Sequence, residues 1–247
     1  MKKNFSFILV FLIFIQNIVF AADHSLVSIR NIILVDKSRH REVPILIYSN
    51  KKFLNKNAKS IVIINHGYTI KNSEYSFIAN TLANKGYTII SIQHDLKNDS
   101  PLPATGSLYQ RRKPLWERGV QNVLYVLAEI KRIELDTSSA KIILIGHSNG
   151  GDISMLFANK YPQLVSQVIS LDSLRMPFPK NINILTLRAI DTKADDGVLP
   201  NKIEQEKFGI QVITLKNARH IDLCDRGSRN LNNEIVNNIL SFLGRKQ

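Results

Sequence analysis

The chain alternates short runs of β-branched residues with longer segments of helical spacing, and this alternation limits the folds open to it. Residues 61–65 (IVIIN) and 141–145 (KIILI) are apolar almost throughout, which is typical of strands buried inside a parallel sheet. Residues 73–84, 115–134 and about 150–160 instead have the spacing of amphipathic helices. Strands that alternate with helices imply right-handed βαβ crossovers. We therefore predict an α/β fold with a mostly parallel central sheet and helices on both faces.

The remaining segments extend the same pattern. Residues 95–114 contain three prolines and several polar residues, so we predict a long loop there. The segment between residues 171 and 182 is too short for a large helical lid domain, and no linker divides the chain. Further strands are expected at 26–35 and 43–49, as a hairpin at the sheet edge, and at 87–92, 165–171, 182–187 and 210–215, with helices at 199–207 and 230–243.

The first residues have the three-part composition of a secretory signal. Met1-Lys2-Lys3 is a basic start, residues 5–20 are almost wholly apolar, and the small residues Ala21 and Ala22 follow. The apolar run is slightly shorter than the roughly 20 residues that a membrane-spanning helix needs. We therefore expect residues 1–22 to be a cleaved signal peptide, cut after Ala21 or Ala22, and residues 23–247 to be one exported domain, periplasmic or secreted.

The net charge of the mature chain indicates which classes of partner it favours. Loss of Lys2 and Lys3 lowers the count of basic residues from 33 to 31 against 20 acidic ones, so the net charge falls from +13 to +11. A basic surface favours weak association with anionic membranes. The basic residues are spread without a long run and no nucleic-acid-binding motif is present, so no nucleic-acid partner is expected. The single cysteine, Cys224, cannot form an internal disulfide. Oligomeric state is left open.

A serine flanked by glycines stands between the strand at 141–145 and the helix that follows it. Gly146, Ser148 and Gly150 form the pattern Gly-x-Ser-x-Gly. In the nucleophile elbow of α/β-hydrolases, the serine occupies a strained turn between a buried strand and a helix, so the residues two positions away must be small. The helix N-terminus would direct N–H groups at the same place. We predict that Ser148 is a nucleophile.

A serine hydroxyl needs a base to take its proton. In this fold the acid and then the histidine follow the serine in the chain. Of the six histidines only His220 lies after Ser148, in a loop after the strand at 210–215, and we predict that it is the base. His147 lies beside the serine, but its side chain is expected to point away from the pocket and to be structural.

The acid that orients the histidine has more than one candidate. Asp172 ends the strand at 165–171, and Asp191 follows the strand at 182–187. Both strand ends can place a carboxylate behind His220, although the fold in general favours the second position. Asp195 and Asp196 also remain candidates. Any of these carboxylates could instead cap a helix or pair with an arginine such as Arg188.

The developing negative charge on an attacked carbonyl needs two backbone donors. One is expected from the N–H of Asn149, directly after the serine. The other is expected from the loop after the strand at 61–65, where Gly67 lets the backbone turn close to the substrate. Tyr68 is the predicted second donor, and two roles are open for its ring: lining the acyl pocket, or packing.

Several short segments form a set: His66-Gly67, Tyr75-Ser76, Leu82-Ala83, Gly86-Tyr87, His94-Asp95, Leu171-Asp172, Met176-Pro177 and Ala218-Arg219-His220. Together they resemble the platelet-activating factor acetylhydrolases and related dienelactone-hydrolase-like esterases. The resemblance covers residues 60–225, with Gly146 to Gly151 similar to their elbow. It implies a calcium-independent hydrolase of short acyl esters without a cofactor or metal, and it moves Asp172 slightly ahead of Asp191 as the acid. The segment 189–200 departs from the family pattern, which keeps the acid open.

These features together predict an exported serine hydrolase that cleaves small carboxylic esters through an acyl-enzyme, with a small-molecule ester as its partner. An amidase or peptidase could use the same residues, because the pocket selects the leaving group. A binding protein on an inactive hydrolase fold is the third hypothesis, against which the order of Ser148 and His220 argues.

Overall fold

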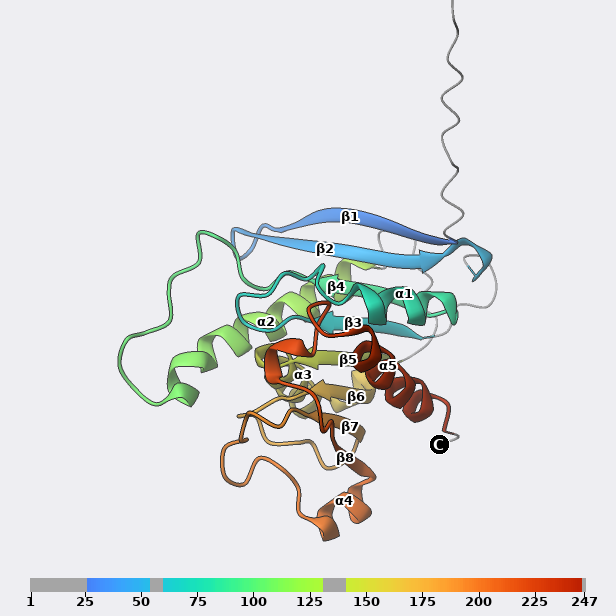
Figure 1. The fold of residues 1–247 in the computed structure, drawn as a ribbon. Helices are drawn as coiled ribbons and strands as arrows, with labels where there is room; N and C mark the ends of the chain where they lie inside the picture. Colours follow the sequence, from blue (N-terminus) through green and yellow to red (C-terminus); the bar gives the residue numbers. More distant parts are fainter. Residues whose placement is uncertain (1–25, 54–59, 131–140, 246–247) are drawn as a thin grey trace, which may run out of the picture.

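The structure is a computed structural model that describes residues 26–53, 60–130 and 141–245. Within these residues, eight strands form one sheet in the order β1-β2-β4-β3-β5-β6-β7-β8 (Figure 1). β2 runs antiparallel to both of its neighbours, and every other pair is parallel. The predicted edge hairpin and mostly parallel sheet are therefore confirmed. The strands are β1 Val27–Asp36, β2 Arg41–Asn50, β3 Ile61–Asn65, β4 Thr88–Ile92, β5 Ile142–His147, β6 Val165–Leu171, β7 Asn183–Arg188 and β8 Ile210–Thr214.

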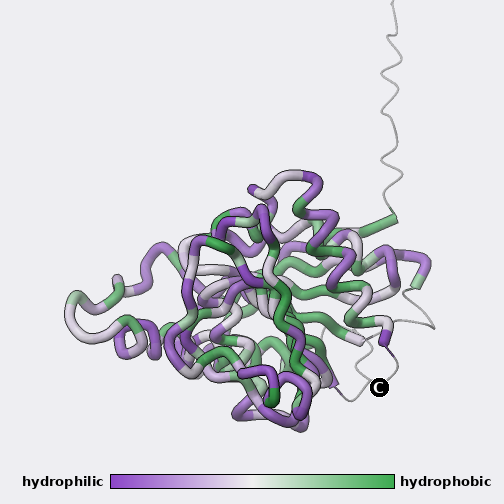
Figure 2. Tube along the Cα trace, turned by 60° about the horizontal axis from the view of Figure 1, so that its bottom comes forward, coloured by the Kyte–Doolittle hydropathy of each residue, from purple (hydrophilic) through white to green (hydrophobic). Residues whose placement is uncertain are grey.

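Helices cover both faces of the sheet, as predicted. α1 and α5 share one buried apolar cluster with one side of the sheet, and α2 and α3 share a second cluster with the other side. The strands are mostly hydrophobic along their length, whereas the outer connections and helices carry most of the hydrophilic residues (Figure 2). The helices are α1 Ser76–Asn84, α2 Leu108–Ile130, α3 Asn149–Lys160, α4 Lys202–Phe208 and α5 Arg229–Leu243.

Helix α2 begins seven residues before the predicted start at 115, and this corrects the loop predicted for 95–114. The Ser107 hydroxyl accepts the backbone N–H of Gln110 and so caps the helix. Pro114 lies inside the helix but is exposed, so water can solvate the carbonyl that its missing N–H leaves free. A segment with three prolines has the composition of a loop, so spacing alone does not show that the helix begins before the third of them, Pro114. The predicted helix end at 134 and the predicted signal at 1–22 lie outside the described residues.

The true loop, residues 95–107, is fixed at its base by ion pairs. Arg41 contacts Asp99 at 2.6 Å, and Arg118 contacts both Asp95 and Asp99 at 3.0 Å. Within the described ranges, none of the helices has the length and hydropathy needed to cross a membrane.

Parallel strands bring residues far apart in the sequence to one edge. The carboxyl ends of β3, β5, β6 and β7 lie side by side in the sheet, and a crevice outside these ends is the usual ligand site of an open α/β sheet.

Candidate active site

Ser148 lies in the sharp turn between β5 and α3. Its backbone has φ 51° and ψ −118°, a left-handed φ that a side-chain-bearing residue seldom adopts. A Cβ on Gly146 would lie 2.2 Å from the carbonyl oxygen of Gly150, and one on Gly150 would lie 2.0 Å from that of Asn65. Both positions therefore require glycine, and the turn leaves Ser148 only partly buried.

His220 lies between Ser148 and Asp172. Its Nε2 is 2.8 Å from Ser148 Oγ, and its Nδ1 is 2.6 Å from Asp172 Oδ2. The His220 side chain is 24% exposed, whereas that of Asp172 is fully buried. The structure thus places these three side chains in hydrogen-bonding order, with the aspartate end buried.

Asp172 directly follows β6 and has φ 61°, which turns its carboxylate under the histidine. Besides His220, it contacts the Arg188 guanidinium at 2.8 Å and accepts the Thr192 hydroxyl. Burial raises the pKa of Asp172, but the hydrogen bond from His220, the charge of Arg188 and the Thr192 bond outweigh it, so this pKa lies below its ordinary value. Asp172 therefore stays ionised beside the histidine.

The other acid candidates do not contact the imidazole in the same way. Asp191 is exposed, and its Oδ1 accepts the backbone N–H of His220 at 2.7 Å. Asp195 and Asp196 are also exposed, and Asp196 pairs with Lys193 at 3.1 Å. The geometry thus favours Asp172 as the acid that orients the His220 imidazole. Asp191 instead accepts a hydrogen bond from the His220 backbone.

The loop that carries His220 is attached to the start of α1. The carboxylate of Asp225 accepts the backbone N–H groups of Ser76 and Phe77, at 3.0 Å and 3.2 Å. Arg226 forms an ion pair with Glu74 at 2.6 Å. These contacts join segments that are about 150 residues apart in the chain. They fix the loop that carries His220 relative to the start of α1.

Asn149, the first of the two predicted backbone donors, begins α3 and is buried. Its side-chain Oδ1 accepts the indole N–H of Trp116 at 2.8 Å. This contact fixes the residue after Ser148 against α2. The helical spacing predicted for residues 115–134 gives no signal for this contact of Trp116.

Gly67 and Tyr68, which carry the second predicted donor, follow β3. Gly67 is buried, and its N–H donates to the Tyr75 hydroxyl at 2.9 Å. Tyr68 is half-buried, and the Arg112 guanidinium lies 4.8 Å from the centre of its ring. The Gly67 N–H is therefore already engaged, which leaves the N–H of Tyr68 as the stronger candidate of the two.

His66 and His94 are buried behind this loop. His66 Nε2 accepts the backbone N–H of His94 at 2.7 Å, and His94 Nε2 lies 2.9 Å from Asn65 Oδ1. Burial lowers the pKa of both imidazoles, so both rings are neutral parts of the framework.

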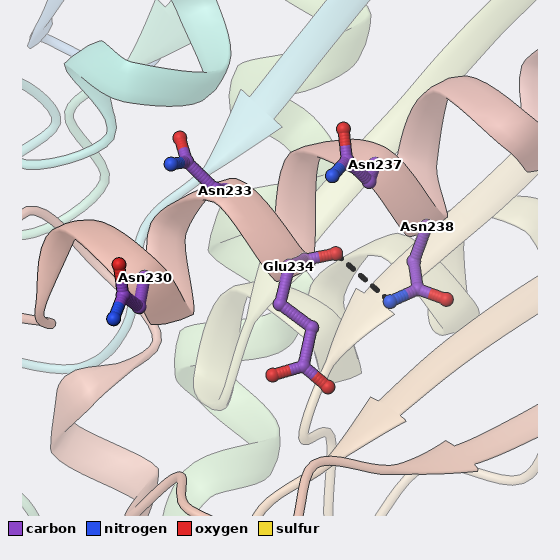
Figure 3. A pocket seen from close by; sticks show the side chains of 5 residues that line it. All are labelled: Asn230, Asn233, Glu234, Asn237 and Asn238. Carbon is purple, nitrogen blue, oxygen red and sulfur yellow. Dashed lines mark hydrogen bonds between the residues drawn. The ribbon is translucent and has the colours of Figure 1, made fainter.

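A separate shallow hollow lies along α5 (Figure 3). Its lining comes from this single helix and contains none of the Ser148, Asp172 and His220 side chains. The hollow is lined by Asn230, Asn233, Glu234, Asn237 and Asn238.

In the part of the chain that the structure describes, no group of three or more His, Cys, Asp or Glu side chains could hold a metal ion.

Comparison with known proteins agrees with this architecture. The sequence model of the α/β-hydrolase fold matches residues 60–193, more than half of the chain. The chain therefore belongs to the α/β-hydrolase fold family. No curated protein sequence is significantly similar to it.

Solved structures show the same fold at low sequence identity. A ferulic acid esterase from Streptomyces cinnamoneus is 13% identical with a TM-score of 0.66, over 92% of this chain and 93% of that one. Est1E from Butyrivibrio proteoclasticus is 13% identical with a TM-score of 0.60, over 87% and 99%. A dienelactone hydrolase from Anabaena variabilis is 16% identical with a TM-score of 0.59, over 87% and 97%. The predicted fold and superfamily are confirmed.

Proposed function

We propose that this protein is a serine hydrolase that cleaves small carboxylic esters. The observation that carries the proposal is the hydrogen-bonded order of Ser148, His220 and Asp172 at the strained turn after β5. An isolated serine is a weak nucleophile, and a base within hydrogen-bond reach activates it. Esterases and dienelactone hydrolases among the structural neighbours support ester hydrolysis as the reaction class.

The geometry supports a two-step reaction. Ser148 Oγ attacks the ester carbonyl while His220 Nε2 takes its proton, and Asp172 keeps the imidazole oriented and stabilises its charged form. The N–H groups of Asn149 and Tyr68 stabilise the oxyanion. His220 then protonates the leaving alcohol. A water molecule, deprotonated by His220, attacks the acyl-enzyme, and Ser148 recovers its proton as the acid product leaves.

A serine-to-alanine exchange tests the reaction. Ser148→Ala should abolish hydrolysis of p-nitrophenyl acetate and labelling by a fluorophosphonate, with an unchanged circular dichroism spectrum. Ser154→Ala, six residues further along the chain and inside α3, is a matched control for labelling, because Ser154 Oγ is already bonded to the Gly150 carbonyl. Undiminished hydrolysis by the Ser148→Ala protein would refute the proposal. A panel of esters and matched amides then defines the leaving group.

We also propose that the protein acts outside the cytoplasm after removal of residues 1–22. The support is the basic start, apolar run and small residues of that segment. Amino-terminal sequencing of the protein from the expressing cells tests this: an intact Met1 on the mature protein would refute export by cleavage.

A further inference from the structure

His147, the residue before Ser148, lies between the two loops that serve the proposed reaction. It is 1% exposed, and its ring centre lies 5.0 Å from that of His220 and 5.9 Å from that of Tyr75. Its side chain was expected to point away from the pocket and to be structural. It is hydrogen-bonded to the backbone carbonyl of His220, the residue whose Nε2 contacts Ser148 Oγ.

The directions of the hydrogen bonds around His147 follow from chemistry. The carbonyl of His220 can only accept, so His147 Nε2, 2.9 Å away, carries a hydrogen and donates it. Burial, and next the nearby charge of His220, lower the pKa of His147 to about 3, so the ring is neutral at physiological pH. Its Nδ1 is therefore an acceptor, and the Tyr75 hydroxyl donates to it at 2.9 Å.

The same hydroxyl oxygen accepts the backbone N–H of Gly67 at 2.9 Å. One directed chain thus runs from Gly67 N–H through the Tyr75 hydroxyl and the His147 ring to the carbonyl of His220. A Cβ on Gly67 would also lie 3.1 Å from His147 Nδ1, so the loop backbone rests on the imidazole. This chain of hydrogen bonds joins Gly67, the residue before Tyr68, to His220, the proposed base.

The other side of Gly67 is fixed independently. His66 Nε2 accepts an N–H from His94, so His66 Nδ1 is the nitrogen that carries a hydrogen, and it donates to the Gly67 carbonyl at 2.7 Å. Both peptide groups of Gly67 are therefore bonded to buried side chains. Only the Tyr75 and His147 side of this arrangement leads to the loop of His220.

We propose that His147 and Tyr75 are positioning residues that fix the oxyanion loop and the base loop relative to each other, an inference that rests on the proposed function. The two loops are far apart in the chain, and the hydrogen-bond chain couples them directly behind Ser148. Misplacement of a reacting group by about 1 Å can cost about a hundredfold in rate. This coupling requires the Nε2–H tautomer of His147, because only that form can donate to the His220 carbonyl and accept from the Tyr75 hydroxyl.

Tyr75→Phe tests the coupling, because it removes one oxygen and keeps the ring that packs on His147. We expect kcat for p-nitrophenyl acetate to fall roughly ten- to a hundredfold with KM within about twofold. Affinity for a trifluoromethyl ketone, which forms a tetrahedral adduct with the serine, should fall by a similar factor. Tyr125→Phe is the matched control: its hydroxyl bonds to the Val35 carbonyl at 2.7 Å on another part of the molecule, and kcat should not change.

His147→Phe provides a second variant, because it keeps a ring in the same place without a donor or an acceptor, and it should show the same loss of kcat and of ketone affinity. Nitrogen-detected NMR of the wild type should show His147 as the neutral Nε2–H tautomer from pH 5 to 8. The inference is overturned if folded Tyr75→Phe and His147→Phe proteins keep kcat and ketone affinity within about twofold, or if His147 carries its hydrogen on Nδ1. A wild type that neither hydrolyses esters nor reacts with a fluorophosphonate would instead refute the proposed function, and this inference with it.

Discussion

The carboxyl ends of β6 and β7 each present an aspartate to His220, yet the two carboxylates contact different parts of it. Asp172 is fully buried and bonds to the imidazole, whereas Asp191 is exposed and bonds to the backbone N–H. Both are aspartates that follow the end of a parallel strand, Asp172 by one residue and Asp191 by three. Depth and direction distinguish them, and these come from the backbone at each strand end.

Two features account for the difference. The left-handed φ of Asp172 turns its side chain under the histidine, and the buried Arg188 at the end of β7 supplies a countercharge there. A buried carboxylate without such partners would take up a proton. Asp191 lies beyond the end of β7, in the solvent-exposed segment, and needs no countercharge. One strand end therefore supports an ionised buried group, and the other supports only a surface contact.

The largest effect that tests this comparison is expected for Asp172→Asn. An amide in place of the carboxylate favours the wrong imidazole tautomer and cannot stabilise the imidazolium, so kcat should fall about 10³- to 10⁴-fold. Steady-state kinetics with p-nitrophenyl acetate measures this, and circular dichroism checks the fold. A variant that keeps its fold and loses less than about tenfold would mean that another group orients His220.

A smaller effect is expected for Asp191→Ala. The substitution removes one hydrogen bond at the backbone of His220 in a solvent-exposed position, so kcat/KM should fall about three- to tenfold. Asp191→Asn is the matched control, because its amide oxygen can still accept the N–H, and it should stay near the wild type. A loss with Asp191→Asn as large as that with Asp172→Asn would reverse the roles assigned to the two strand ends.

The smallest effect concerns stability and pH. Because the folded pKa of Asp172 lies below the ordinary aspartate value of 3.8, its ionised form contributes stability that is fully present above that value and is lost as the pH falls through the folded pKa. The difference in unfolding free energy between wild type and Asp172→Asn should stay constant near neutrality and shrink in acid, by at most about 1.4 kcal/mol per pH unit. Urea titrations at several pH values measure it. A difference that widens in acid would show that burial outweighs Arg188 and His220.

Much of the fold could be predicted because it depends on local patterns. Apolar runs marked the buried strands, and the glycines around Ser148 marked the sharp turn. The start of α2 could not be read in this way, because a capping serine and an exposed proline inside a helix look like loop residues in sequence. The contacts of Tyr75 and Trp116 with the site had no sequence signal, since each joins segments far apart in the chain. Pairing of an acid candidate with Arg188 was one predicted alternative, but not that the paired carboxylate would also contact His220.

The sequence by itself determined the class of fold, the turn at Ser148 and the histidine available to it, because strand and helix periodicity, glycine spacing and chain order are properties of the chain alone. Only the tertiary structure decided which carboxylate lies behind His220 and that His147 links two loops. Those outcomes depend on depth, backbone direction and charge pairing at the edge where the parallel strands end, and neighbouring strands there bring together residues that no local pattern connects.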